Sequence, residues 1–323
     1  MALGDPDELY ARATELAERA PEPAVSGNLV TGTAGWTDPT LIKSGLFYPR
    51  GFNSPRARLE YYARHFAMVE VDATYYTLIT QETVQRWCEA TPPGFVFHVK
   101  AHPVFTGHPM DVRRFPGDLR KVLEDLGHEA RVYKDKLPSE LVFEIEQRFF
   151  APLELLEQER KLGVVLLQYP PWFTATRRNA RQIEATRQRY PGARFAVEFR
   201  HKSWLSPARR ERVFGLLREL GMTYVCVDEP EGAVGGLPPL IEVTTPKLAI
   251  VRFHGRNRAA WARRGASVQE RFDYLYSAEE LASWVPPTRR LAQSAERVHA
   301  VFNNCVRNYA VLNAKGLVVL LGA

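Results

Sequence analysis

The sequence predicts an α/β protein of the (β/α)8 TIM-barrel class, and two observations lead to this. Eight short apolar runs, rich in Val, Phe and Leu, alternate with amphipathic helical patterns along the 323 residues, as in a parallel sheet covered by helices. Each run ends in polar or charged residues, as barrel strands do where they carry a site. An open doubly wound sheet is the alternative. We disfavour it because no glycine-rich phosphate loop follows the first run.

The expected elements follow from these patterns in chain order. The apolar runs predict strands at 29–34, 68–72, 95–100, 164–168, 194–200, 223–227, 248–254 and 298–303. The helical patterns between them cover 56–66, 81–90, 153–162, 179–190, 207–220, 278–291 and 307–316. Residues 1–28 are expected to be a partly helical N-terminal extension, and 29–323 a single barrel domain. Two long connections, 101–152 after the third strand and 255–297 after the seventh, are predicted insertions at the site-bearing face.

Composition narrows the class of protein. The formal net charge of +6 comes from many scattered arginines and is by itself a weak sign of nucleic-acid binding. Cys88, Cys226 and Cys305 lie far apart without a CxxC pair, which argues against a zinc site or a disulfide framework and fits a reducing compartment. The acidic start has no apolar leader pattern, and the run at 317–321 is too short to span a bilayer. We therefore expect a cytoplasmic protein with no membrane partner.

The parity of the strands places charged side chains inside the predicted barrel. In a strand, alternate residues share a face, so Glu198 and Arg200 lie opposite Phe199, and the same rule groups His98 with Lys100. Arg252 repeats the pattern on the seventh strand. Buried charges are costly unless they pair with each other or with a ligand. The predicted interior therefore holds either a functional site or a purely structural ion network, in which Lys100 and Arg252 neutralise Glu70 and Glu198.

The catalytic candidates are Glu198, His98 and Glu70, with Glu198 and His98 best suited to acid–base work. Carboxylates and imidazoles come from several strands, but there is no HExxH motif, and Lys100 and Arg252 oppose a dication. We therefore expect no metal. No GxSxG motif supports a nucleophile, and no nicotinamide or flavin cofactor is expected.

Seven motifs together resemble the YecE-like family, a domain of unknown function with a TIM-barrel fold. They are GTAGW at 32–36, VEVDATYY at 69–76, FHVKAH at 97–102, LLQYPPWF at 166–173, AVEFRHKSW at 196–204, RFHGR at 252–256 and FNN at 302–304. The resemblance implies shared positions at Trp36, Glu70, Tyr76, Lys100, Gln168, Glu198, Arg200, His201, Trp204, Arg252, His254, Arg256, Asn303 and Asn304. Apart from Glu70 and Glu198, we assign these positions to substrate binding. Asp72 and His102 depart from the family pattern, which usually has Asn and Pro there.

The function expected from these residues is that of a hydrolase- or lyase-type enzyme acting on an anionic ligand, either a phosphorylated sugar or a nucleotide-like molecule. Lys100, Arg200, Arg252 and Arg256 would hold the anion, while Gln168 and Asn303 would orient it. The alternative is a non-catalytic nucleic-acid-binding protein that uses Arg256, Arg258, Arg263, Arg264 and the aromatic residues near the strand ends. The sequence predicts no oligomeric state.

Overall fold

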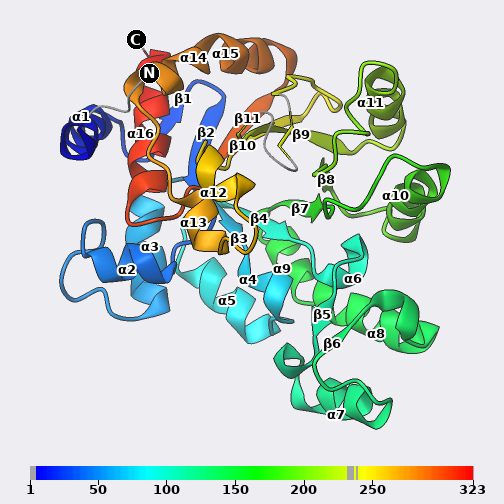
Figure 1. Cartoon of the computed structure of the whole chain (residues 1–323). Helices are drawn as coiled ribbons and strands as arrows, with labels where there is room; N and C mark the ends of the chain where they lie inside the picture. Colours follow the sequence, from blue (N-terminus) through cyan, green and yellow to red (C-terminus); the bar gives the residue numbers. More distant parts are fainter. Residues whose placement is uncertain (1–4, 231–235, 238, 323) are drawn as a thin grey trace.

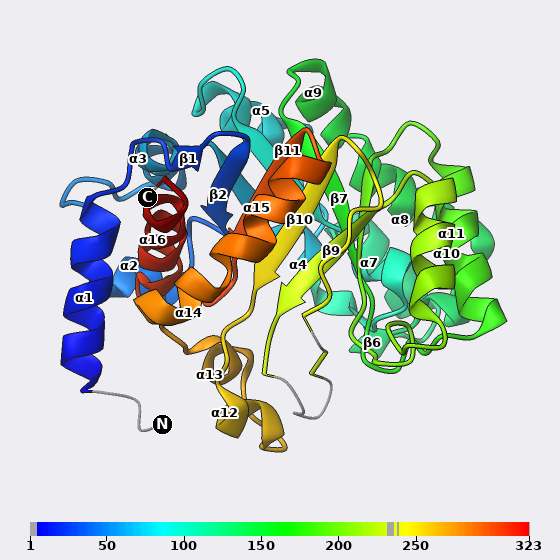
Figure 2. The same cartoon turned by 90° about the horizontal axis from the view of Figure 1, so that it is seen from above.

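The chain forms an α/β fold around a curled, mostly parallel sheet (Figure 1). The structure is a computed structural model that describes residues 5–230, 236–237 and 239–322. Nine strands follow the order β1-β2-β11-β10-β9-β8-β7-β4-β3, and β1 alone runs antiparallel, against β2. The arrowheads of β2, β9 and β10 point to one side of the molecule (Figure 2), so their carboxyl ends share a face.

All eight predicted strands are present, with ends that differ by no more than two residues. The strands are β1 (Val25–Ser26), β2 (Leu29–Thr33), β3 (Met68–Val71), β4 (Val96–Lys100), β5 (Met110–Asp111), β6 (Arg131–Val132), β7 (Leu162–Gln168), β8 (Phe195–Glu198), β9 (Thr223–Asp228), β10 (Leu248–Phe253) and β11 (Arg297–Phe302). Three two-residue strands were not predicted: β1, which pairs with β2, and the separate β5–β6 pair. The prediction of an α/β fold is confirmed.

Helices cover the outside of the sheet and fill its connections. They are α1 (Pro6–Glu18), α2 (Pro39–Ser44), α3 (Pro55–His65), α4 (Ala73–Tyr76), α5 (Gln81–Glu89), α6 (Pro103–Thr106), η1 (Val112–Arg114), α7 (Gly117–Asp125), η2 (Lys134–Lys136), α8 (Ser139–Phe150), α9 (Leu153–Gln158), α10 (Arg177–Arg189), α11 (Arg210–Glu219), α12 (Arg258–Ala262), α13 (Val268–Phe272), α14 (Ala278–Ser283), α15 (Val285–Ser294) and α16 (Tyr309–Gly322). None within the described ranges is both long and apolar enough to cross a membrane.

Two helix predictions need correction. The single helix expected at 278–291 is divided into α14 and α15 at Trp284, because Pro286 and Pro287 lack the N–H groups that a continuous helix needs. The last helix extends to Gly322 rather than ending at 316. Most of its residues are apolar, which allows α1, α14 and β2 to pack around it.

The long connections extend away from the sheet at its carboxyl-end side. The segment between β4 and β7 contains α6 to α9 together with the β5–β6 pair, and Figure 1 shows α7 and α8 standing off the sheet. The segment between β10 and β11 contains α12 to α15. At the other end of the chain, α1 packs along α16. The domain boundary at residue 28 stays a prediction, although β1 lies in the predicted extension and pairs with β2.

The curled sheet closes where β2 meets β3. A single parallel bridge, between Ala34 and Glu70, joins the two edges. Gly32 allows this approach, because a Cβ atom built there would lie 2.4 Å from the carbonyl oxygen of Met68. This closure places Glu70 near the inward-facing residues of the other strands, where the candidate site lies.

We expect Gly32→Ala to lower the free energy of unfolding by about 1 to 3 kcal/mol, because a backbone carbonyl cannot easily move away from the new methyl group. Gly215→Ala in α11 is the matched control. No heavy atom lies within 4 Å of its Cβ position, so this change should stabilise by about 1 kcal/mol. Urea denaturation measures both. Equal midpoints for Gly32→Ala and the wild type would show that β2 and β3 are not so close.

Candidate functional site

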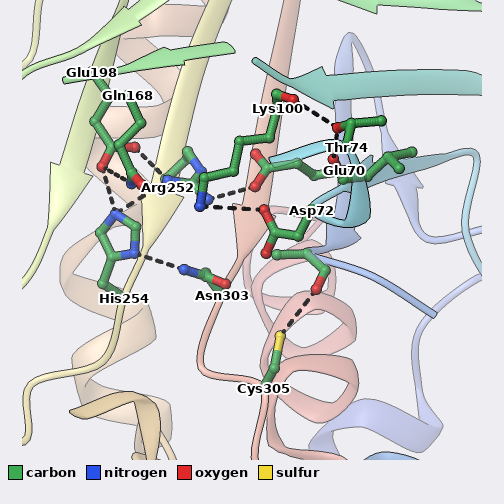
Figure 3. Close-up of polar contacts among 12 residues, drawn as sticks. Glu70, Asp72, Thr74, Lys100, Gln168, Glu198, Arg252, His254, Asn303 and Cys305 are labelled. Atoms are coloured by element: carbon green, nitrogen blue, oxygen red, sulfur yellow. Dashed lines mark hydrogen bonds and ion pairs between the residues drawn. The ribbon is translucent and has the colours of Figure 1, made fainter. Parts of the chain in front are cut away.

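Arg252 lies at the centre of the candidate site, between the carboxylate of Glu70 on β3 and that of Glu198 on β8 (Figure 3). Its side chain is 0% exposed. Its Nη2 atom lies 2.5 Å from Oε1 of Glu70, and its Nη1 atom donates to Oε2 of Glu198. A buried guanidinium is tolerated when such pairs compensate the loss of hydration. This contact joins β10 to β3 and to β8.

Glu198 collects several further donors on its second oxygen. Its Oε1 atom accepts hydrogen bonds from Nε2 of Gln168 at 2.6 Å and from Nη1 of Arg200 at 3.2 Å. Burial raises the pKa of Glu198, but Arg252, His254 and Arg200 outweigh it and hold the pKa well below the ordinary value. Glu198 is therefore ionised at neutral pH.

For Glu70, the effect of burial on the pKa outweighs that of the neighbouring cation. Burial raises the pKa of Glu70 to about 7, because the attraction of Arg252 does not offset the loss of hydration and the nearby charge of Asp72 adds to it. Two carboxylates on one guanidinium thus differ in their affinity for a proton. Such a split is typical of sites that move protons, although structural ion networks also produce it.

His254 is held in one tautomer by its neighbours. The amide nitrogen of Asn303 donates to Nδ1 at 3.1 Å, so the ring proton lies on Nε2, which faces Oε1 of Glu198 at 3.2 Å. Burial lowers the pKa of His254 to about 4, although the charge of Glu198 opposes the shift. The imidazole is therefore neutral at physiological pH and donates to Glu198.

Lys100 lies beside Asp72 near Glu70 (Figure 3). Its Nζ atom is 3.5 Å from Oδ1 of Asp72 and 4.9 Å from the centre of the Tyr75 ring. The side chains of Lys100 and Asp72 are 13% and 29% exposed, so both reach toward solvent. Asp72, one of the two departures from the family pattern, thus supplies a counterion for Lys100.

Arg200 occupies the opposite side of the site with a partner that the sequence analysis missed. Its Nη1 atom lies 2.9 Å from Oε2 of Glu229, and its guanidinium lies 4.9 Å from the centre of the Trp261 ring. Burial raises the pKa of Glu229 to about 7, against the attraction of Arg200. Glu229 directly follows β9, so the rule that selected the other strand ends could have found it.

Arg256 belongs to a separate cluster. Its Nε and Nη2 atoms lie 2.8 Å and 2.5 Å from the two oxygens of Asp228, which also accepts from the Tyr276 hydroxyl and the Trp284 indole. This geometry occupies two of the donor atoms of the guanidinium. Arg256 therefore holds the loop after β10 in place.

His98 faces inward but lies one layer deeper than Arg252. Its Nε2 atom is 2.7 Å from Nδ1 of His299, and its Nδ1 atom accepts from the backbone N–H of Val164. His299 pairs in register with Ile250, two residues before Arg252. In the part of the chain that the structure describes, His98 makes no hydrogen bond to Glu70 or Glu198.

Several predicted binding residues lie outside the cluster. The Trp204 ring is buried against Phe199, and its indole donates to the carbonyl of Phe173 at 2.6 Å. The Trp36 ring is buried against Trp87 and Phe97. Both tryptophans are buried in the hydrophobic core, and neither makes a hydrogen bond to Glu70, Glu198 or Arg252 among the described residues.

The remaining predicted residues have local partners. Asn304 binds the carbonyl of Tyr274 and the side chain of Asn313, each at 2.8 Å. His201 pairs with Ser203 in its own turn at 2.8 Å. Tyr76 is 45% exposed, and Arg114 lies over its ring. His102, the second departure from the family pattern, caps α6 through the N–H of Val104.

The central cluster does not resemble a metal centre. Arg252 stands between Glu70 and Glu198, where a cation would otherwise bind both carboxylates. Within residues 5–230, 236–237 and 239–322, no three His, Cys, Asp or Glu side chains are grouped to hold a metal ion.

Comparisons with known proteins identify the family. Residues 30–323 match the model described as "Protein of unknown function DUF72". The chain belongs to the DUF72 family. UPF0759 protein YunF of Bacillus subtilis is 29% identical over 293 residues, which cover 90% of this chain and 93% of YunF.

Solved structures of other DUF72 proteins share the fold. A DUF72 family protein from Thermotoga maritima is 32% identical with a TM-score of 0.69, and the match covers 90% of this chain and 97% of that one. A second from Enterococcus faecalis is 25% identical with a TM-score of 0.74, covering 91% and 96%. The fold described above is thus that of the DUF72 family.

Replacing Arg252 should destabilise the protein strongly. Arg252→Met leaves Glu70 and Glu198 without their shared partner, and we expect a loss of about 3 to 5 kcal/mol in urea denaturation. Arg263→Met is the control. It breaks an exposed pair with Glu270, which should cost less than about 1 kcal/mol. Similar losses in the two variants would contradict a central role for Arg252.

His254 should remain a neutral Nε2–H tautomer at pH values well below the ordinary pKa of histidine. Its pKa is lowered in the folded state, so the unfolded chain takes up the proton first. The contribution of His254 to stability is therefore lost as the pH falls from about 6.5 toward about 4. Nitrogen NMR at pH 5.5 measures the tautomer, and Asn303→Leu should weaken its preference. An imidazolium signal at that pH would refute the assignment.

Proposed function

We propose that the chain is a hydrolase- or lyase-type enzyme that acts on an anionic ligand, a phosphorylated sugar or a nucleotide-like molecule. We place the reaction at the carboxyl-end mouth of the curled sheet, which we interpret as a (β/α)8 barrel with insertions after its third and seventh strands. The observation that carries the proposal is the asymmetry of Glu198. Arg252 fixes one oxygen, while the other faces Gln168, Arg200 and His254.

Glu198 acts as the general base in this proposal. Its low pKa keeps it ionised, and Oε1 borders Gln168 and Arg200, both of which are partly exposed. An anion that engages Arg200 removes one of the three donors to Oε1 and weakens the attraction of that cation, which raises the affinity of Glu198 for a proton. His254, oriented by Asn303, positions the carboxylate and replaces part of its lost hydration.

The cations divide into two roles that differ from the expectation based on sequence. Lys100 and Arg200 are partly exposed and are proposed to hold the anion. Arg252 is completely buried and Arg256 is engaged by Asp228, so we assign both to holding the protein's own carboxylates. Glu70 then serves to fix Arg252, and His98 receives no catalytic role.

The nucleic-acid alternative has less support from the geometry. Arg256 and Arg263 each form an ion pair within the chain, and Trp261 is 8% exposed. Arg256 and Trp261 are therefore engaged within the protein, whereas Arg263 is held only by an exposed ion pair. We further propose that the YecE-like motifs and the DUF72 match describe the same family.

Glu198→Gln should reduce turnover by about 100-fold or more, because a general base typically contributes at least that factor. Wild-type protein is first incubated with a panel of sugar phosphates and nucleotides, and products are detected by mass spectrometry. Glu70→Gln is the matched control, since it makes the same change on the other side of Arg252 and should retain most activity. Melting temperatures of both variants show whether a loss of turnover comes from a loss of stability. Equal losses of activity in the two variants, or no turnover across the panel, would contradict the proposal.

A further inference from the structure

A cavity lies away from the Arg252 cluster, between the insertion after β4 and helix α10. Its volume is about 670 Å³, within the range of small-molecule sites. Residues of η2 and α8 line one wall, and residues of α10 line the other. The loop after β7 adds Pro170, Trp172 and Phe173.

Trp172 is the unusual residue of this cavity. The chain has six tryptophans, and the other five are at most 9% exposed, whereas Trp172 is 58% exposed. The ring is nevertheless supported at its edge by His108, at a centroid distance of 5.6 Å. His108 is itself bound to the Thr106 hydroxyl at 2.8 Å. An exposed but supported indole is suited to stacking against a planar ring.

Basic and amide groups complete the cavity walls. The carboxylate of Glu146 is buried and draws Lys134 to 2.7 Å and Arg189 to 3.0 Å. Arg178 also lines the cavity, and among the described residues no carboxylate pairs with it. Counting Asp135 and the Glu146 partner behind the wall, the three basic groups of Lys134, Arg178 and Arg189 exceed the acidic groups by one charge. The amide of Gln182 adds a donor and an acceptor to the same wall.

We propose that this cavity binds a nucleoside monophosphate, with its base against Trp172 and its phosphate toward Arg178. Stacking uses the exposed indole, and a guanidinium without a carboxylate partner is suited to a phosphate. A second exposed ring, Tyr133, lines the same cavity and is 46% exposed. The assignment is independent of the chemistry proposed for Glu198.

Isothermal titration calorimetry with AMP, at low salt and on the full chain, tests the site. We expect a Kd below about 1 mM, with adenosine and ribose 5-phosphate each binding at least about 10-fold more weakly, because each lacks one of the two contacts. Trp172→Ala and Arg178→Gln should each weaken AMP binding by about 10-fold or more. Both side chains are exposed, so the variants should melt like the wild type.

Matched variants distinguish this cavity from the barrel mouth. Trp172→Phe retains a ring and should preserve most of the affinity. Arg177→Gln changes the neighbouring exposed arginine, which does not line the cavity, and should have no effect. Lys100→Met alters the mouth and should leave the Kd within about 2-fold. No binding of AMP by the wild type, or binding that Lys100→Met abolishes and Trp172→Ala does not, would overturn the proposal.

Discussion

The contact of Arg252 with Glu70 and Glu198 is the interaction on which the interior of this protein depends. Neither carboxylate could be buried at this depth without a compensating charge, and one guanidinium serves both. Because the two acids come from β3 and β8, the contact also fixes the spacing of strands that are not neighbours in the sheet. The position of Glu198, on which the hydrogen bond from His254 depends, follows from this arrangement.

Strand parity was sufficient to predict the central cluster, but not its depth or its surroundings. Alternation along each strand assigns Glu198 and Arg252 to the interior, and the structure brings them together. Parity shows which face of a strand a residue lies on, but not how far along the strand it lies from the carboxyl end. The sequence therefore could not show that His98 lies deeper in the interior than Arg252. An aromatic residue just beyond a strand has no such periodicity. For that reason nothing in the sequence showed that Trp36 packs against Trp87 of α5, or that Trp204 stacks on Phe173 and Phe199 in the core.

A row of aromatic rings connects Lys100, at the carboxyl end of β4, to the cavity beside α10. Lys100 lies over Tyr75, whose ring is 5.4 Å from that of His108, and His108 in turn contacts Trp172. His108 and Trp172 lie in the connections after β4 and β7, whereas Tyr75 follows β3. These connections therefore bring two chemically different surfaces next to each other: a charged interior and an open aromatic wall.

The closure between β2 and β3 has a dynamic consequence. Every other pair of neighbouring strands is held by at least two register pairs, whereas Ala34 and Glu70 form the single bridge at this junction. Local opening of the sheet therefore breaks the fewest backbone contacts between these two strands. Glu70 is nevertheless tied through Arg252 to the far wall. Separation of β2 from β3 must therefore also stretch the ion pair between Arg252 and Glu70, so charges in the interior oppose opening at the sheet's edge.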